Sequence, residues 1–315
     1  MVAGGIDERS ISRANDRRRG GFVESEGGGT LLLARGSLAA ELGLPVLGVV
    51  AFAESFADGA HTSIPAPGLG ALSAARGGAD SRLARDLAAL GVSADDIAVL
   101  SKHDTSTSAN DPNESDLHER LARALGRSAG NPLYVISQKA LTGHAKGGAA
   151  AFQLAGLCQV LRGGIVPPNR SLDCVDPALR RHEHLVWLRQ PLDLRAAPPK
   201  AGLLTSLGFG HVSALIALVH PEAFVAALAA ERGKDAAQAW RAAATAREHQ
   251  GLRRLEEAMR GGPALYQRPA ERNLGGGDPA ALTEREAAVL LSESARLRGG
   301  VLEPDPGAEG TSQRG

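Results

Sequence analysis

The chain has 315 residues, 43% of them hydrophobic and 22% charged, and its formal net charge is +0 with an isoelectric point near 7.1. These values predict a globular protein with one large domain or two small ones. They argue against nucleic acid or an anionic membrane as a partner. Aromatic residues make up only 3% of the chain, which disfavours recognition by base stacking.

The cysteines and the N-terminus favour a cytoplasmic protein. The chain has two cysteines, Cys158 and Cys174, which are too few for a disulfide framework at this length. The first residues lack the basic and apolar regions of a signal peptide. The best apolar run, residues 44–53, is shorter than the roughly 20 residues that cross a bilayer, so we expect no membrane span.

Glycines that interrupt strands or end helices divide the first quarter of the chain into short predicted elements. The segment FVESEGGGTLLLA, residues 22–34, predicts strands interrupted by glycines. A short helix is expected next, with Ser37 as its N-cap and Gly43 just after its end. The valine-rich residues 44–56 predict a long buried strand, and the glycine- and proline-rich residues 58–78 predict a loop.

From residue 80 onward, strand and helix patterns alternate, which predicts an α/β layered fold. The predicted elements are helix 80–91, strand 96–103, helix 113–126 capped by Asn113 or Ser115, strand 132–139, helix 147–164 with small residues on one side, and two strands in 199–220 joined at 208–210. Residues 221–260 predict helices. The last residues, 262–315, predict a partly disordered tail around one possible helix, 281–298.

Polar side chains gather where three of the predicted strands end. They are His103 in SKHDTST, Lys139 and His144 in SQKALTGHAKGG, and the GFG turn at 208–210. Ligands of open α/β sheets bind at such strand ends, so these residues are candidates for a site. The alternatives are two structural histidines, a solvated lysine and a plain tight turn.

A metal centre is a rival interpretation of the same residues. His103 with Asp104 resembles the His-Asp pair of some metal hydrolases, but the chain has no HExxH or CxxC motif. The HEH run at 182–184 lies in a polar connection and is expected to be solvated. TGHAKGG lacks the ending of a phosphate-binding loop. We therefore predict no metal ligands.

Several motifs in their order resemble β-ketoacyl synthases, most closely the ketosynthase region of actinobacterial type I fatty acid synthases. They are KHDTSTSANDPNE, KALTGHAKGGAA, FVESEGGGTLLLA, NRSLDCVDP and SLGFGHVSALIAL. The resemblance implies the thiolase-like fold, in which two similar halves each hold a mixed five-stranded sheet. It implies the last strands of the N-terminal half in 1–66, a complete C-terminal half in 67–222, peripheral helices in 223–262 and the tail in 263–315.

The activity implied by this resemblance is decarboxylative Claisen condensation in fatty acid biosynthesis. An acyl group held on a cysteine would react with a malonyl group carried on the phosphopantetheine of an acyl carrier protein, with no cofactor of the chain's own. Further expected partners are the other modules of the fatty acid synthase, and the full enzyme is expected to be an oligomer.

The same resemblance assigns roles to individual residues. The implied catalytic residues are His103, His144 and Lys139. The implied supporting residues are Asp111, Glu114 and Phe209, with Glu114 hydrogen-bonding near Lys139, and the implied substrate contacts are Thr105, Thr107, Gly208 and Gly210.

One departure from the family concerns the nucleophile. Residues 1–100 contain no cysteine, and Cys158 and Cys174 match structural positions of the family. The resemblance therefore implies that the nucleophilic cysteine lies in sequence before Met1, so we expect the isolated chain to be inactive and poorly soluble. The alternative is a non-catalytic fragment, or an assembly surface of the same multi-enzyme.

Overall fold

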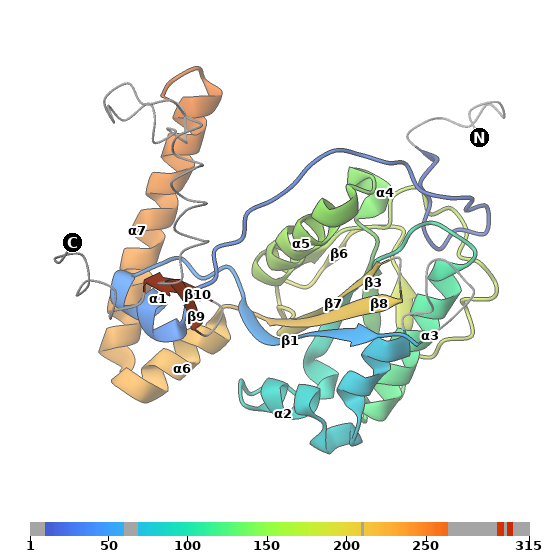
Figure 1. The fold of residues 1–315 in the computed structure, drawn as a ribbon, viewed down its shortest axis with the longest axis horizontal. Coiled ribbons are helices and arrows are strands. Elements are labelled where there is room, and N and C mark those ends of the chain that lie inside the picture. The colour runs from blue at the N-terminus through green and yellow to red at the C-terminus, as the bar shows by residue number, and fades with distance from the viewer. Residues whose placement is uncertain (1–9, 60–68, 209–210, 264–294, 299–300, 305–315) are drawn as a thin grey trace, which may run out of the picture. The chain divides into compact units, whose positions relative to one another are not determined.

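The computed structural model describes residues 10–59, 69–208, 211–263, 295–298 and 301–304. The chain forms two compact units, Met1–Glu248 and His249–Gly315. In the first unit, a central sheet has helix α5 on one face and helices α2 and α3 on the other (Figure 1). No helix among the described residues is long and apolar enough to cross a membrane.

The central sheet has six strands in the order β1-β8-β7-β2-β3-β5. Their bounds are β1 Val49–Ala57, β8 Val212–Val219, β7 Ala201–Gly208, β2 Ile97–Ser101, β3 Leu133–Ile136 and β5 Leu185–Trp187. Strands β7, β2, β3 and β5 are parallel, whereas β8 is antiparallel to both of its neighbours. The sheet is therefore mixed, and the carboxyl ends of β2 and β3 lie side by side.

The other helices and strands have the following bounds. The helices are α1 Gly36–Leu42, α2 Arg82–Ala88, α3 Asn110–Ala124, α4 Lys139–Thr142, α5 Ala149–Gly163, α6 Glu222–Arg232 and α7 Lys234–Met259. Two small antiparallel pairs are β4 Ile165–Val166 with β6 Leu192–Asp193, and β9 Ala295–Arg298 with β10 Val301–Pro304.

Side chains along β2 and β7 point alternately to the two faces of the sheet, and each face has its own apolar core. Leu100 and Leu203 join the cluster under α2 and α3, while their neighbours Val99 and Leu204 join the cluster under α5. Both faces of these strands are covered, which is why they are almost continuously apolar in sequence. Burying one such leucine contributes roughly 1.5–3 kcal/mol, so this packing holds the strand ends firmly in place.

Most predicted elements are confirmed, but the first residues of two helices differ. Gly43 ends α1 with a left-handed φ of 60°, as predicted, but the N-cap residue is Arg35 rather than Ser37. Helix α3 begins at Asn110, before either predicted cap. The reason is that the Thr107 hydroxyl accepts a hydrogen bond from the backbone N–H of Asn110, which starts the helical turn early.

Strand β1 is not the buried strand that residues 44–56 predicted. Among the described strands it pairs with β8 alone and forms one edge of the sheet, and most of its side chains are exposed or half-buried. This strand also makes the sheet six-stranded, where the resemblance implied five. The predicted helix 281–298 lies mostly outside the described residues, and its end, Ala295–Arg298, is strand β9.

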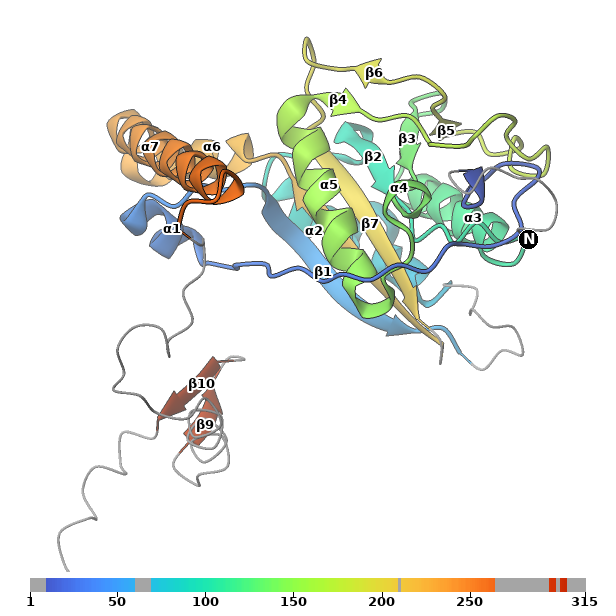
Figure 2. The ribbon, with the colours of Figure 1, turned by 90° about the horizontal axis from the view of Figure 1, so that it is seen from above.

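The predicted strands of the segment FVESEGGGTLLLA are wrong for this structure. Residues 22–34 run extended over α5 (Figure 2), and their only pairing among the described residues is an isolated bridge between Glu24 and His144. No other described strand lies alongside, so the backbone has no ladder to join. Leu31, Leu32 and Leu33 stay largely exposed, at 50%, 85% and 76%.

Candidate active site

Two neighbouring strands bring the candidate catalytic residues together. His103 follows the end of β2, and Lys139 begins α4 just after the end of β3. Gly143, at φ 70°, turns the chain out of α4 so that His144 comes next to His103. The two imidazole rings lie 5.3 Å apart between centroids and are nearly perpendicular. Residues 41 positions apart in sequence therefore form one site.

The ammonium group of Lys139 is buried and has three acceptors. Its Nζ donates to the backbone carbonyl of His103, lies 3.2 Å from the Nδ1 of the same histidine and donates to Gln153 Oε1 at 3.3 Å. Burial lowers the pKa of Lys139 to about 8, although nearby carboxylates oppose this shift. While Lys139 is protonated, it therefore holds the His103 ring at the Nδ1 atom.

His144 is held through the same ring atom. Its Nδ1 accepts a hydrogen bond from the backbone N–H of Lys146 at 3.1 Å, and its ring lies 4.8 Å from that of Phe22. A neutral imidazole that accepts at Nδ1 carries its proton on Nε2. Both histidines have a donor at Nδ1, so each presents an Nε2–H group.

Burial keeps both histidines neutral. Burial, together with the positive charge of Lys139, lowers the pKa of His103 well below its ordinary value and that of His144 to about 4. At neutral pH, the pair is therefore a set of uncharged hydrogen-bond donors rather than a pair of cations.

A buried carboxylate fixes the turn that carries His103. Glu114 accepts hydrogen bonds from the backbone N–H groups of His103 and Asp104, and from the Thr205 hydroxyl. Burial raises the pKa of Glu114. The resemblance implied that Glu114 hydrogen-bonds near Lys139. In the structure both side chains meet the backbone of His103, Glu114 at its N–H group and Lys139 at its carbonyl.

The strap formed by residues 12–19 is the part of the site that sequence reasoning missed. Its residues are mostly polar or charged, yet Asn15 is buried against the second carboxylate of the site, that of Asp111. The backbone N–H of Asn15 donates to Asp111 at 2.9 Å, and Arg19 lies 3.5 Å from the same carboxylate. Burial raises the pKa of Asp111 to about 7. An asparagine in a polar stretch gives no signal of such contacts.

The predicted substrate contacts are only partly placed. Thr105 is buried, and its hydroxyl lies 3.0 Å from that of the half-buried Thr107. Gly208 ends β7 and is exposed. Phe209 and Gly210 lie outside the described residues.

The HEH run is solvated only in part: Glu183 is exposed and His182 is half-buried, whereas His184 is buried, contrary to the prediction. His184 is only 2% exposed, and its Nδ1 lies 3.1 Å from Glu119 Oε1. Glu183 comes near enough to complete a possible set of three ligand atoms. However, Arg123 donates to the same Glu119 oxygen at 3.0 Å, so the carboxylate already has a cationic partner. This cluster is therefore a structural contact between α3 and β5.

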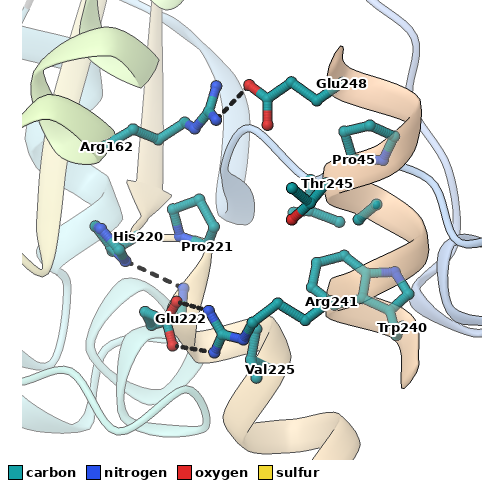
Figure 3. Close-up of a pocket in the computed structure, with 12 residues that line it drawn as sticks. Pro45, Arg162, His220, Pro221, Glu222, Val225, Trp240, Arg241, Thr245 and Glu248 are labelled. Carbon is teal, nitrogen blue, oxygen red and sulfur yellow. Dashed lines mark hydrogen bonds and ion pairs between the residues drawn. The ribbon is translucent and has the colours of Figure 1, made fainter. Parts of the chain in front are cut away.

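A separate pocket of about 250 Å³ lies between the end of β8 and helices α6 and α7 (Figure 3). Its charged groups form two ion pairs, Arg162 with Glu248 at 2.6 Å and Arg241 with Glu222 at 2.8 Å. Trp240 forms part of its wall. Both guanidinium groups have carboxylate partners, so the pocket offers no unpaired charge to a ligand.

Known proteins match most of this chain in sequence. Residues 47–173 match the family model of the β-ketoacyl synthase C-terminal domain. Fatty acid synthase alpha subunit stcJ of Emericella nidulans is 44% identical over 228 residues, which is 72% of this chain and 14% of that protein. The corresponding subunit hexA of Dothistroma septosporum is 39% identical over 253 residues, or 71% of this chain and 15% of that protein.

Solved structures show the same relationship. The noncanonical ketosynthase FabY from P. aeruginosa has a TM-score of 0.62 and 26% identity, and the match covers 78% of this chain and 38% of that one. The ketosynthase of a type II PKS, in complex with its acyl-carrier protein, has a TM-score of 0.55 and 25% identity, and the match covers 68% of this chain and 48% of that one.

This chain belongs to the β-ketoacyl synthase family and has its thiolase-like fold. It spans about a seventh of the length of the fungal fatty acid synthase subunits named above. The predicted family is thereby confirmed. The narrower resemblance to actinobacterial synthases stays a prediction, since both of those relatives are fungal.

Proposed function

We propose that this chain is the C-terminal ketosynthase part of a fatty acid synthase and that it stabilises the enolate formed when a malonyl thioester loses CO₂. The supporting observation is the pair of neutral histidines, each with its Nδ1 occupied by a donor and its Nε2–H left free.

The two Nε2–H groups suit the charge that develops in this reaction. Loss of CO₂ leaves an electron pair on the carbon next to the thioester, and this pair is shared with the thioester oxygen. His103 and His144 donate hydrogen bonds to that oxygen, and each donor contributes roughly 3–4 kcal/mol to the transition state. The carbanion then attacks the acyl thioester of the condensation partner, and the thiolate leaves.

Lys139 supports this step without touching the reacting atoms. Its ammonium group fixes the His103 ring, and its positive charge disfavours protonation of both histidines. Asp111 and Glu114 hold the surrounding turns. The role of Phe209 as the gate beside the acyl group, and those of Thr105, Thr107, Gly208 and Gly210 along the pantetheine arm, remain predictions from the resemblance.

The acyl-carrying cysteine comes, in this proposal, from a ketosynthase half outside these 315 residues. Cys158 lies in α5 against the core under that helix, and burial raises the pKa of its thiol, which disfavours the nucleophilic thiolate. Cys174 contacts Arg180 in the loop beyond β4 and is not among the contacts of either histidine. The malonyl donor is carried on the phosphopantetheine of an acyl carrier protein.

The test joins this chain to a cysteine-bearing ketosynthase half and measures CO₂ release and condensation from malonyl-acyl carrier protein. We expect His144→Ala to lower the rate by about 10²–10³-fold, because one oxyanion donor is lost. His249→Ala, at an exposed histidine of α7, is the matched control and keeps full activity.

Two outcomes would contradict the proposal. One is unchanged CO₂ release from the His144→Ala variant. The other is a stable acyl-enzyme formed by the isolated chain, which would make Cys158 or Cys174 the nucleophile. A joined protein that binds acyl carrier protein but releases no CO₂ would favour the non-catalytic assembly role instead.

A further inference from the structure

Asn15 lies at the centre of a buried polar cluster beneath His103. It is 0% exposed and uses every polar group it has. Its Oδ1 accepts from Lys102 Nζ at 3.1 Å, while its Nδ2 donates to Asp104 Oδ2 at 2.8 Å and to Ser137 Oγ at 3.2 Å. Its backbone N–H is taken by Asp111.

The residues that Asn15 joins flank His103 on both sides in sequence. Lys102 and Asp104 are each 0% exposed in their side chains, and their Nζ and Oδ1 atoms lie 2.7 Å apart as an ion pair. Asp104 has a φ of +34°, in the region that non-glycine residues avoid. Such a conformation persists only where surrounding contacts hold it, so this cluster constrains the turn that orients His103.

An asparagine suits this place because an amide both accepts and donates while carrying no charge. Toward Lys102 it presents oxygen, and toward Asp104 it presents nitrogen. An aspartate would set a second carboxylate against Asp104, and a leucine would leave a buried cation and a buried anion without these partners. Either change carries a large cost at a fully buried position.

We propose that Asn15 is a positioning residue for His103, which acts by locking Asp104 and Lys102 into the turn that aims the imidazole. The role of Asn15 in the reaction rests on the proposed function, whereas its effect on the His103 ring does not.

An exchange of the two side chains tests this directly. In Asn15→Asp the new carboxylate faces Asp104, and in Asp104→Asn two amides meet with no arrangement that satisfies both Lys102 and Asn15. In the double variant the acid and the amide trade places. Lys102 again meets two oxygens, Ser137 again has one donor and one acceptor, and the net charge returns to its original value.

Asp16→Asn serves as the matched control from the next position of the strap. Asp16 is equally buried, but its carboxylate accepts from the backbone N–H groups of Asp173 and Cys174, away from His103. This variant is expected to lower thermal stability without changing the His103 ring.

The first readout is the imidazole ¹⁵N spectrum of the 315-residue chain labelled with ¹⁵N-histidine. The His103 signals are identified as those that disappear in the His103→Gln variant. We expect the His103 signals to shift or broaden in each single variant, to return in the double variant and to stay unchanged in Asp16→Asn. The second readout is kcat for CO₂ release in the joined protein, which should fall on the order of a hundredfold in each single variant and recover in the exchange.

The outcomes distinguish the positioning role of Asn15 from the proposed function of the chain. If Asn15→Asp and Asp16→Asn lower the melting temperature alike and neither moves the His103 signals, the positioning role is overturned and Asn15 only stabilises the strap. Failure of the double variant to restore the signals has the same consequence. If the signals behave as expected but wild-type protein releases no CO₂, the proposed function fails while the positioning role stands.

Discussion

At the scale of single residues, the site depends on keeping two histidines uncharged beside a lysine. Burial is the main cause of the lowered pKa of His103, His144 and Lys139, and the lysine charge strengthens the effect on both rings. A pair of imidazolium ions 5.3 Å apart would repel each other, so the neutral state is also the state in which the rings can share one oxygen.

These values predict an unusual pH profile for CO₂ release. His144 stays neutral above about pH 4, and Lys139 keeps its proton below about pH 8, so neither of these two groups should change the rate between these limits. It should fall at higher pH as Lys139 loses the charge that holds His103. In Lys139→Met the rate should be lower and the alkaline fall absent. An acid limb near pH 6.5 would contradict this account, because it would mean that a histidine titrates as in solution.

The sequence indicated the catalytic candidates but not what holds them. His103, Lys139 and His144 end recognisable strands, and parallel strands bring such ends to one edge. Asn15 carries no comparable signal, since its partners Lys102 and Asp104 lie 87 and 89 positions away and nothing local to it predicts those contacts.

At the scale of elements, the close approach of the extended segment to α5 decides what fits between them. A Cβ added at Gly148, just before α5, would lie 2.3 Å from the carbonyl oxygen of Gly27, whereas one added at Gly147 would meet nothing within 4 Å. The prediction of a helix with small residues suited to close packing is thus confirmed, although its partner is an extended segment as well as a sheet.

We predict opposite effects for the same substitution at these neighbouring glycines. Gly148→Ala should lower the free energy of unfolding by about 1–3 kcal/mol, because the Gly27 backbone must move away. Gly147→Ala should leave it unchanged or raise it by up to about 1 kcal/mol through reduced freedom of the unfolded chain. Urea unfolding followed by circular dichroism measures both. Equal effects would show that the segment does not lie against α5 in solution.

At the scale of the whole molecule, three consecutive leucines lack a cover. Leu31, Leu32 and Leu33 lie on the extended segment of residues 22–34 and are largely exposed, and soluble proteins rarely leave such a run exposed without a partner. The ketosynthase FabY extends well beyond the part that this chain matches. We therefore infer that the other ketosynthase half covers these leucines in a complete enzyme.

This inference predicts two effects of the double variant that carries Leu32→Lys and Leu33→Lys, one on aggregation and one on assembly. The isolated chain should aggregate less in light scattering and keep its melting temperature, because the two side chains pack on nothing that matters for its own stability. Mixed with a separate cysteine-bearing half, the same variant should restore condensation poorly. Met259→Lys, at another exposed apolar residue, is the control and should assemble normally. Normal assembly of the double variant would place the interface elsewhere.

The amino-acid order alone determined the family, the alternation of strands and helices, and the two histidines with their lysine, because these depend on local motifs and periodicity. Only the tertiary structure decided that β1 is an exposed edge, that residues 22–34 form no strand pair, and that α3 begins at Asn110. It also decided that Asn15 lies beneath His103. Strand pairing and buried polar contacts depend on neighbours distant in sequence, so no local pattern could reveal them.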